Sequence, residues 1–122
     1  MSKRDERSLI SYLAIILAHL YKWDNYTGIA SHKTKGGKNW INSIVNARKE
    51  IEDLVSDMPS LERFIESFET IQKAWEEALK IIRKDLLKNG IKNVNLPNSC
   101  PYDIIDILYR DVIYEYKKKY NL

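Results

Sequence analysis

Cysteine, histidine and long apolar runs are scarce in this chain, and each scarcity excludes a class of protein. A single cysteine cannot form a disulfide within the chain, so the cytoplasm is the expected compartment. His19, His32 and Cys100 are too few and too scattered along the sequence for a zinc site. We therefore expect no metal or other cofactor.

No segment is long enough to cross a membrane. The most apolar stretch, Leu9–Trp23, is shorter than the roughly 20 apolar residues that span a bilayer. The charged residues before it include Asp5 and Glu6, and no small-residue cleavage site follows, which argues against a secretory signal. We expect neither a membrane partner nor export.

The stretch Leu9–Trp23 is the predicted centre of the fold. Its apolar residues recur at helical spacing and also occupy the flanks of the cylinder, a pattern typical of a helix with neighbours on all sides. The stripe consists of Leu9, Tyr12, Leu13, Ile16, Leu17, Leu20 and Trp23, widened by Ile10, Ala14, Ile15 and Ala18.

The remaining periodic segments predict an all-α fold, a compact bundle of about four helices around this first helix. Capping signals help to place the ends: Asn39, Ser60 and Ser99 as starts, Pro101 in a first turn and Gly90 as a stop. The 122 residues fit one helical domain, 1–122. The predicted helices cover approximately 5–23, 39–57, 60–89 and 100–119.

Charge is distributed unevenly along the chain, although the net charge is only +3. Residues 1–49 carry nine Lys/Arg against three Asp/Glu, residues 50–77 carry two against nine, and residues 78–122 carry nine against five. This pattern fits either ordinary solvated helix faces or a bipolar surface for a partner.

Two basic segments are candidates for binding a polyanion. The long loop 24–38 carries Lys33, Lys35 and Lys38, but it lacks the spacing of a phosphate-binding loop. The tail 111–122 carries Lys117, Lys118 and Lys119 among tyrosines, a composition that suits stacking of single-stranded bases. Against this interpretation stand the modest charge and the absence of a helix-turn-helix pattern.

Three polar residues are candidates for a half-buried role. His19 lies on the central helix and is a base, a ligand or a buried hydrogen-bonding side chain. Arg48 flanks an apolar stripe, where we expect it to be half-buried and paired with a carboxylate. Cys100 is either a small buried apolar residue or a nucleophile that folding brings near His19.

Several short patterns, taken together in order, resemble one known family. They are His19-Leu20-x-Lys22-Trp23, Trp40, Ala47-Arg48-x-x-Ile51-Glu52-x-Leu54, Asp57-x-Pro59-Ser60-Leu61, Leu96-Pro97-x-x-Cys100-Pro101-Tyr102 and Ile107-Leu108. Their order and spacing, over about residues 8–110, resemble the family called domain of unknown function 29.

The resemblance implies an all-helical fold and no assigned activity, and it supplies no catalytic residues. Members of that family carry further helical sequence in front of the matching part. Without it, part of the central helix would be uncovered, and a second copy of the chain could cover it. We therefore expect a homodimer or another protein partner.

The sequence favours a non-enzymatic protein-interaction module, such as an adaptor or an antitoxin-like partner. A nucleic-acid-binding accessory protein that uses lysines 33–38 and the Lys/Tyr tail is the alternative. A small hydrolase that depends on Cys100 is a more distant third.

Overall fold

The computed structural model describes residues 3–29 and 37–122, and within them it contains six α-helices, one 3-10 helix and no strand. The predicted all-α fold is confirmed. The helices are α1 (Lys3–Asn25), η1 (Thr27–Ile29), α2 (Lys38–Asp57), α3 (Leu61–Glu66), α4 (Phe68–Lys88), α5 (Ile104–Tyr109) and α6 (Val112–Lys119).

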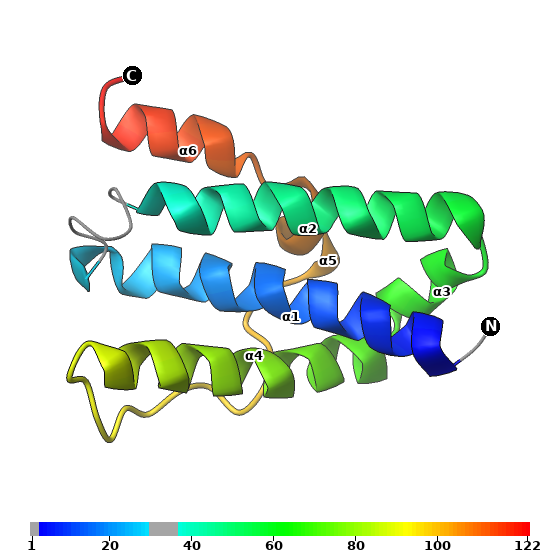
Figure 1. The fold of residues 1–122 in the computed structure, drawn as a ribbon, viewed down its shortest axis with the longest axis horizontal. Helices are drawn as coiled ribbons and strands as arrows, with labels where there is room; N and C mark the ends of the chain where they lie inside the picture. Colours follow the sequence, from blue (N-terminus) through cyan, green and yellow to red (C-terminus); the bar gives the residue numbers. More distant parts are fainter. Residues whose placement is uncertain (1–2, 30–36) are drawn as a thin grey trace.

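α1 lies between α2 and α4, as Figure 1 shows. α4 runs in the same direction as α1, and α2 runs in the opposite direction. α5 lies behind α1 and α2 in this view, and α6 packs along the outer side of α2. The long connection from α4 to α5 crosses the back of the bundle (Figure 1).

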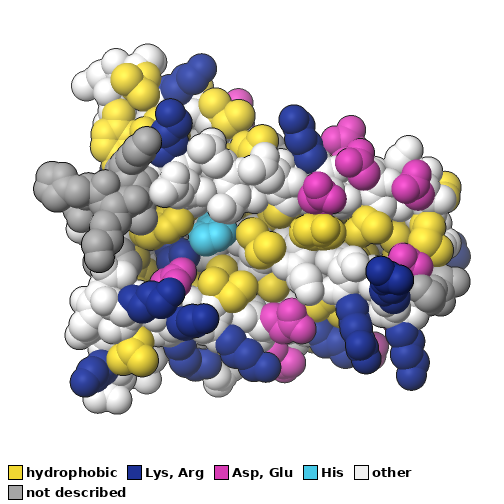
Figure 2. All heavy atoms as spheres, in the orientation of Figure 1, with side chains coloured by type: hydrophobic (Ala, Val, Ile, Leu, Met, Phe, Trp, Pro, Cys, Tyr) yellow, Lys and Arg dark blue, Asp and Glu magenta, His cyan; other side chains and the backbone are white. Residues whose placement is uncertain are grey.

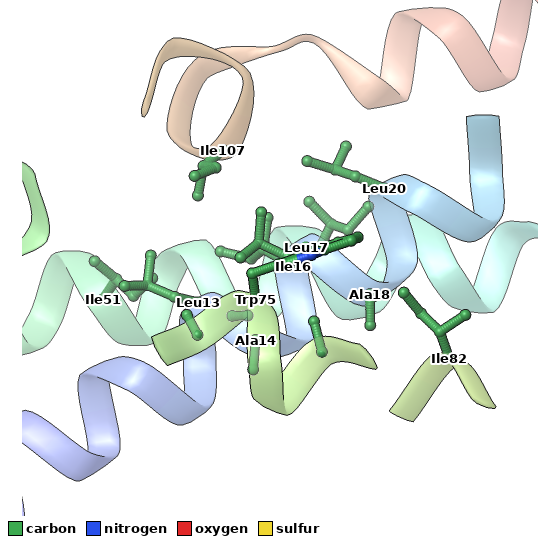
Figure 3. Close-up of a cluster of buried hydrophobic side chains, with 14 of the residues drawn as sticks. Leu13, Ala14, Ile16, Leu17, Ala18, Leu20, Ile51, Trp75, Ile82 and Ile107 are labelled. Carbon is green, nitrogen blue, oxygen red and sulfur yellow. The ribbon is translucent and has the colours of Figure 1, made fainter. Parts of the chain in front are cut away.

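The side chains of α1 form the middle of the core, as predicted. Leu13, Ile16 and Leu17 are completely buried, and Figure 3 shows them facing Trp75 of α4 and Ile107 of α5. Burial of one such aliphatic side chain stabilises the fold by about 1.5–3 kcal/mol. Because the single chain covers these residues, α1 needs no second copy to bury its main apolar stripe.

One strip along the middle of α1 is more accessible than the residues that pack into the core. Ser11 is exposed, and Ile15 and His19, one and two turns further on, are only partly buried. A second copy could still cover this strip.

The predicted helix 60–89 is in fact two helices. Ser67 is extended (φ −71°, ψ 138°) and caps α4, because its hydroxyl accepts a hydrogen bond from the Thr70 N–H. The extended residue rotates Phe68 out of the apolar stripe, and this side chain is 76% exposed. Ser60 stands before α3 as predicted, but its side chain makes no capping hydrogen bond.

The predicted helix 100–119 is also divided, and it starts later than expected. Asp103, rather than Ser99, caps α5, in a capping box with Asp106. Pro101 therefore precedes the helix instead of occupying its first turn. The chain then bends at Arg110, and Asp111 caps α6 through the Tyr114 N–H.

Gly37 takes the place of the predicted cap Asn39 at the start of α2. Its φ is +93°, a left-handed conformation that favours glycine, and a Cβ here would lie 2.9 Å from the Trp23 ring. A glycine therefore lets the start of α2 approach the end of α1. The predicted stop at Gly90 is confirmed, since α4 ends at Lys88 and Gly90 has φ +77°.

Candidate functional site

Arg48 of α2 holds the end of α5 in place. Its guanidinium is half-buried and donates hydrogen bonds to the carbonyl oxygens of Asp106 (3.0 Å), Ile107 (2.9 Å) and Arg110 (2.8 Å). The last carbonyls of a helix have no partner within the helix, and a cation there is favoured. The prediction that Arg48 pairs with a carboxylate is therefore wrong, because its hydrogen-bond partners are backbone carbonyls. Burial lowers the pKa of Arg48.

Arg110 ties the junction between α5 and α6 to the end of α1. It donates to both oxygens of Asp24 (2.9 and 2.6 Å) and to both oxygens of Glu115 (2.7 and 2.6 Å). The Tyr102 hydroxyl also donates to Asp24, at 2.7 Å. Burial would raise the pKa of Asp24, but the hydrogen bonds from Arg110 and Tyr102 outweigh it and hold that pKa below its usual value.

α5 and α6 each expose two large apolar or aromatic side chains. We refer to these four residues, Ile105, Tyr109, Ile113 and Tyr114, as the α5–α6 face. Ile105 and Tyr109, one turn apart on α5, are 64% and 74% exposed, and the two α6 residues are also exposed. Figure 2 shows hydrophobic side chains gathered over α6. Exposed apolar groups of this kind, when they form a patch, often mark an interface.

The described lysines of the predicted polyanion site meet at one end of the bundle. Lys38 begins α2, and Lys117, Lys118 and Lys119 end α6, at the same end of the bundle in Figure 1, and all four are exposed. The Lys119 Nζ lies 5.8 Å from the centroid of the Trp23 ring, which also contacts the backbone before Lys38. Lys33, Lys35 and His32 lie outside the described residues.

A buried charge lies between α1, α2 and α4. The Lys22 side chain is only 1% exposed; it forms an ion pair with Asp85 of α4 and lies 5.0 Å from the centroid of the Trp40 ring. Burial lowers the pKa of Lys22, and Asp85 partly offsets this effect.

His19 lies beside this pair and stays neutral at physiological pH. Its Nδ1 is buried and has no hydrogen-bond partner among the described residues. Burial and the neighbouring Lys22 charge lower its pKa to about 4, against the opposing influence of Asp85.

Cys100 is held within the connection that crosses α4. Its N–H donates to the Gln72 side chain (3.3 Å) and its thiol donates to the Tyr102 carbonyl (3.4 Å), and burial raises the pKa of the thiol. His19 lies near Asp85, which is about 20 Å along α4 from Gln72 at helical rise. The structure therefore does not bring His19 and Cys100 together as a nucleophile and its base.

Among the described residues, no group of three or more His, Cys, Asp or Glu side chains is placed so that it could hold a metal ion. No described helix carries an apolar stretch long enough to traverse a bilayer.

The arrangement is a helical framework in which Lys22, Arg48 and Arg110 have partners within the fold, while Ile105 and Tyr109 are exposed. The family model described as Domain of unknown function DUF29 matches residues 1–113. The chain belongs to this DUF29 family. No curated protein and no solved structure matches the chain.

Sequence reasoning missed several residues that shape this DUF29 chain. Asp24, Arg110 and Glu115 were not singled out, since nothing in the sequence indicates that chain-distant charges meet. A signal did exist for Lys22, because it continues the row of buried small residues Ala14 and Ala18 at four-residue spacing.

Proposed function

We propose that this chain is a non-enzymatic protein-interaction module, an adaptor or an antitoxin-like partner, that binds another polypeptide through the α5–α6 face. The observation that carries the proposal is the exposure of Ile105 and Tyr109 on a helix whose end is held by hydrogen bonds from Arg48 and Arg110. A preorganised apolar surface loses little conformational entropy on binding. The single cysteine suits action in the reducing cytoplasm.

The partner polypeptide is a different protein or a second copy of the chain. Aromatic side chains such as Tyr109 and Tyr114 are enriched at interfaces, where they combine a large contact area with one polar atom. Lys117 and Lys118 continue the outer side of α6 beyond Ile113 and Tyr114. A partner that is apolar in its centre and acidic at one edge would complement this arrangement.

The test compares the wild type with the double variant Ile105→Ser, Tyr109→Ser. Gentle purification followed by native mass spectrometry should show a bound polypeptide, or a dimer, that the double variant loses. Phe68→Ser is the matched control, because Phe68 is equally exposed but lies at the start of α4. The proposal fails if the wild type is a bare monomer at micromolar concentration, or if the double variant keeps its partner.

As a second candidate we propose binding of single-stranded nucleic acid at the end formed by Lys38 and Lys117–Lys119. The observation that favours it is that Lys119 of α6 lies over the Trp23 ring, which also packs against Gly37, the residue before Lys38. Phosphate contacts weaken steeply as salt rises, whereas an apolar interface does not. Replacing Lys38, Lys117 and Lys118 with Gln should abolish salt-sensitive binding to an oligonucleotide in fluorescence anisotropy; binding that is unchanged would exclude this site.

A further inference from the structure

A pocket at the carboxyl end of α4 has features of a ligand site. Its volume is about 440 Å³, within the range of roughly 300–1,000 Å³ that is usual for small-molecule sites. Four apolar and three polar side chains line it, and none of them is acidic. They are Arg83, Leu86, Leu87, Ile91, Lys92, Asn93 and Val94.

Two left-handed turns build this pocket. Gly90 (φ +77°) reverses the chain after α4, so that the Ile91 N–H donates to the Leu86 carbonyl at 2.9 Å. This is the hydrogen-bond pattern of a Schellman motif, in which the residues corresponding to Leu86 and Ile91 pack together. Asn93 (φ +57°) turns the chain again and brings Val94 back to the same side.

The floor of the pocket is apolar and its rim is cationic. Leu86 is buried, and Ile91 and Val94 are half-buried. Arg83 and Lys92 are exposed at the rim, and neither forms an ion pair or side-chain hydrogen bond with another described residue. In contrast, hydrogen bonds or ion pairs within the fold engage the cationic side chains of Arg48, Arg110 and Lys22. The two rim cations are therefore available to an external anion.

We propose that this pocket binds a small amphipathic carboxylate, whose aliphatic chain lies on the Leu86–Ile91–Val94 floor and whose carboxylate accepts hydrogen bonds from Arg83 and Lys92. Guanidinium and ammonium donors form charge-assisted hydrogen bonds with a carboxylate. The Asn93 amide is a further donor at the same rim. The site is separate from the α5–α6 face, so it does not depend on the function proposed above.

Decanoate, used below its micelle-forming concentration, is the probe. Titration into labelled protein, followed by amide chemical shifts, should perturb residues 83–94 first. In the series from hexanoate to decanoate, each added methylene that packs on the apolar floor should raise the affinity about fourfold. Neutral decanol should bind at least about tenfold more weakly than decanoate.

The deciding variant is Arg83→Gln, Lys92→Gln, and its matched control is Lys80→Gln, Lys84→Gln. Both pairs remove two exposed charges, but only the first pair lines the pocket. The first should weaken decanoate binding about tenfold, and the control should change it less than twofold. The proposal would be overturned by equal losses of decanoate affinity in both variants, or by amide shift changes centred outside residues 83–94. Binding to anionic vesicles without binding of free decanoate would also overturn it.

Discussion

Lys22 places a positive charge in the core, and its partner Asp85 is itself one-third exposed. Removing one member of a buried pair is costly because the other charge stays buried, whereas an apolar replacement of similar shape is often tolerated. At pH 7, Asp85→Asn should lower the free energy of unfolding by about 2 kcal/mol, a value reduced for the exposure of Asp85. Lys22→Met should change it by less than about 1 kcal/mol.

Urea unfolding of both variants and of the double variant measures this difference. The double variant should recover most of the stability lost in Asp85→Asn, because no unpaired buried charge remains. A larger loss in Lys22→Met than in Asp85→Asn would contradict the account.

His19 makes stability depend on pH. Its pKa is about 4 in the folded protein and 6.5 when unfolded, so the unfolded chain binds a proton between these values that the folded chain does not. Stability is therefore fully present above pH 6.5 and decreases as the pH falls toward 4. The expected loss from pH 7 to pH 5 is about 2 kcal/mol.

Denaturant midpoints measured in steps from pH 7 to pH 5 test this dependence, above the range where ordinary carboxyl groups titrate. His19→Gln should remove most of the change in midpoint with pH, since glutamine does not titrate. A slope that is the same in both proteins would assign the pH dependence to other groups.

At the scale of elements, α5 has only six residues, Ile104–Tyr109, and Arg48 donates hydrogen bonds to two of its carbonyls and to that of Arg110, which follows it. Arg48→Met should destabilise the protein by about 2–3 kcal/mol, because hydrogen bonds to charged groups are lost and carbonyls are left unpaired. Hydrogen exchange should increase most in residues 104–110. Lys49→Met, a neighbouring exposed change, should leave exchange there unaltered; uniform acceleration in both variants would argue against the capping role.

The helical periodicity of the sequence was sufficient to predict α1, α2 and the all-α class. It was insufficient at Ser67 and Arg110, where the apolar spacing continues across a break. At Ser67 one extended residue interrupts the helix, and at the second break two residues, Arg110 and Asp111, are non-helical. The Ser67 and Asp111 side chains then cap the helices that follow. Arg48 could be singled out from the sequence because a charge beside an apolar stripe is a local pattern. Its carbonyl partners could not be predicted, because α5 is distant from Arg48 in the chain.

For the whole molecule, the arrangement predicts an order of local stability. α1 is enclosed by α2 and α4 and holds the completely buried Leu13 and Leu17, whereas α6 buries only Val112 fully. Native-state hydrogen exchange should show the slowest amides in α1, approaching the global unfolding free energy, and fast local opening in α6. Equal protection in α1 and α6 would mean that the bundle opens only as one unit.

The position of α1 also constrains how the chain acquires its structure during synthesis. The apolar helix Lys3–Asn25 precedes α4, its packing neighbour, by more than forty residues of sequence. At translation rates of about 5–20 residues per second, α1 leaves the ribosome several seconds before α4 is complete. During that interval the side of α1 that packs against α4 has no permanent cover, so a nascent-chain chaperone would find its binding segment in side chains that later become the core.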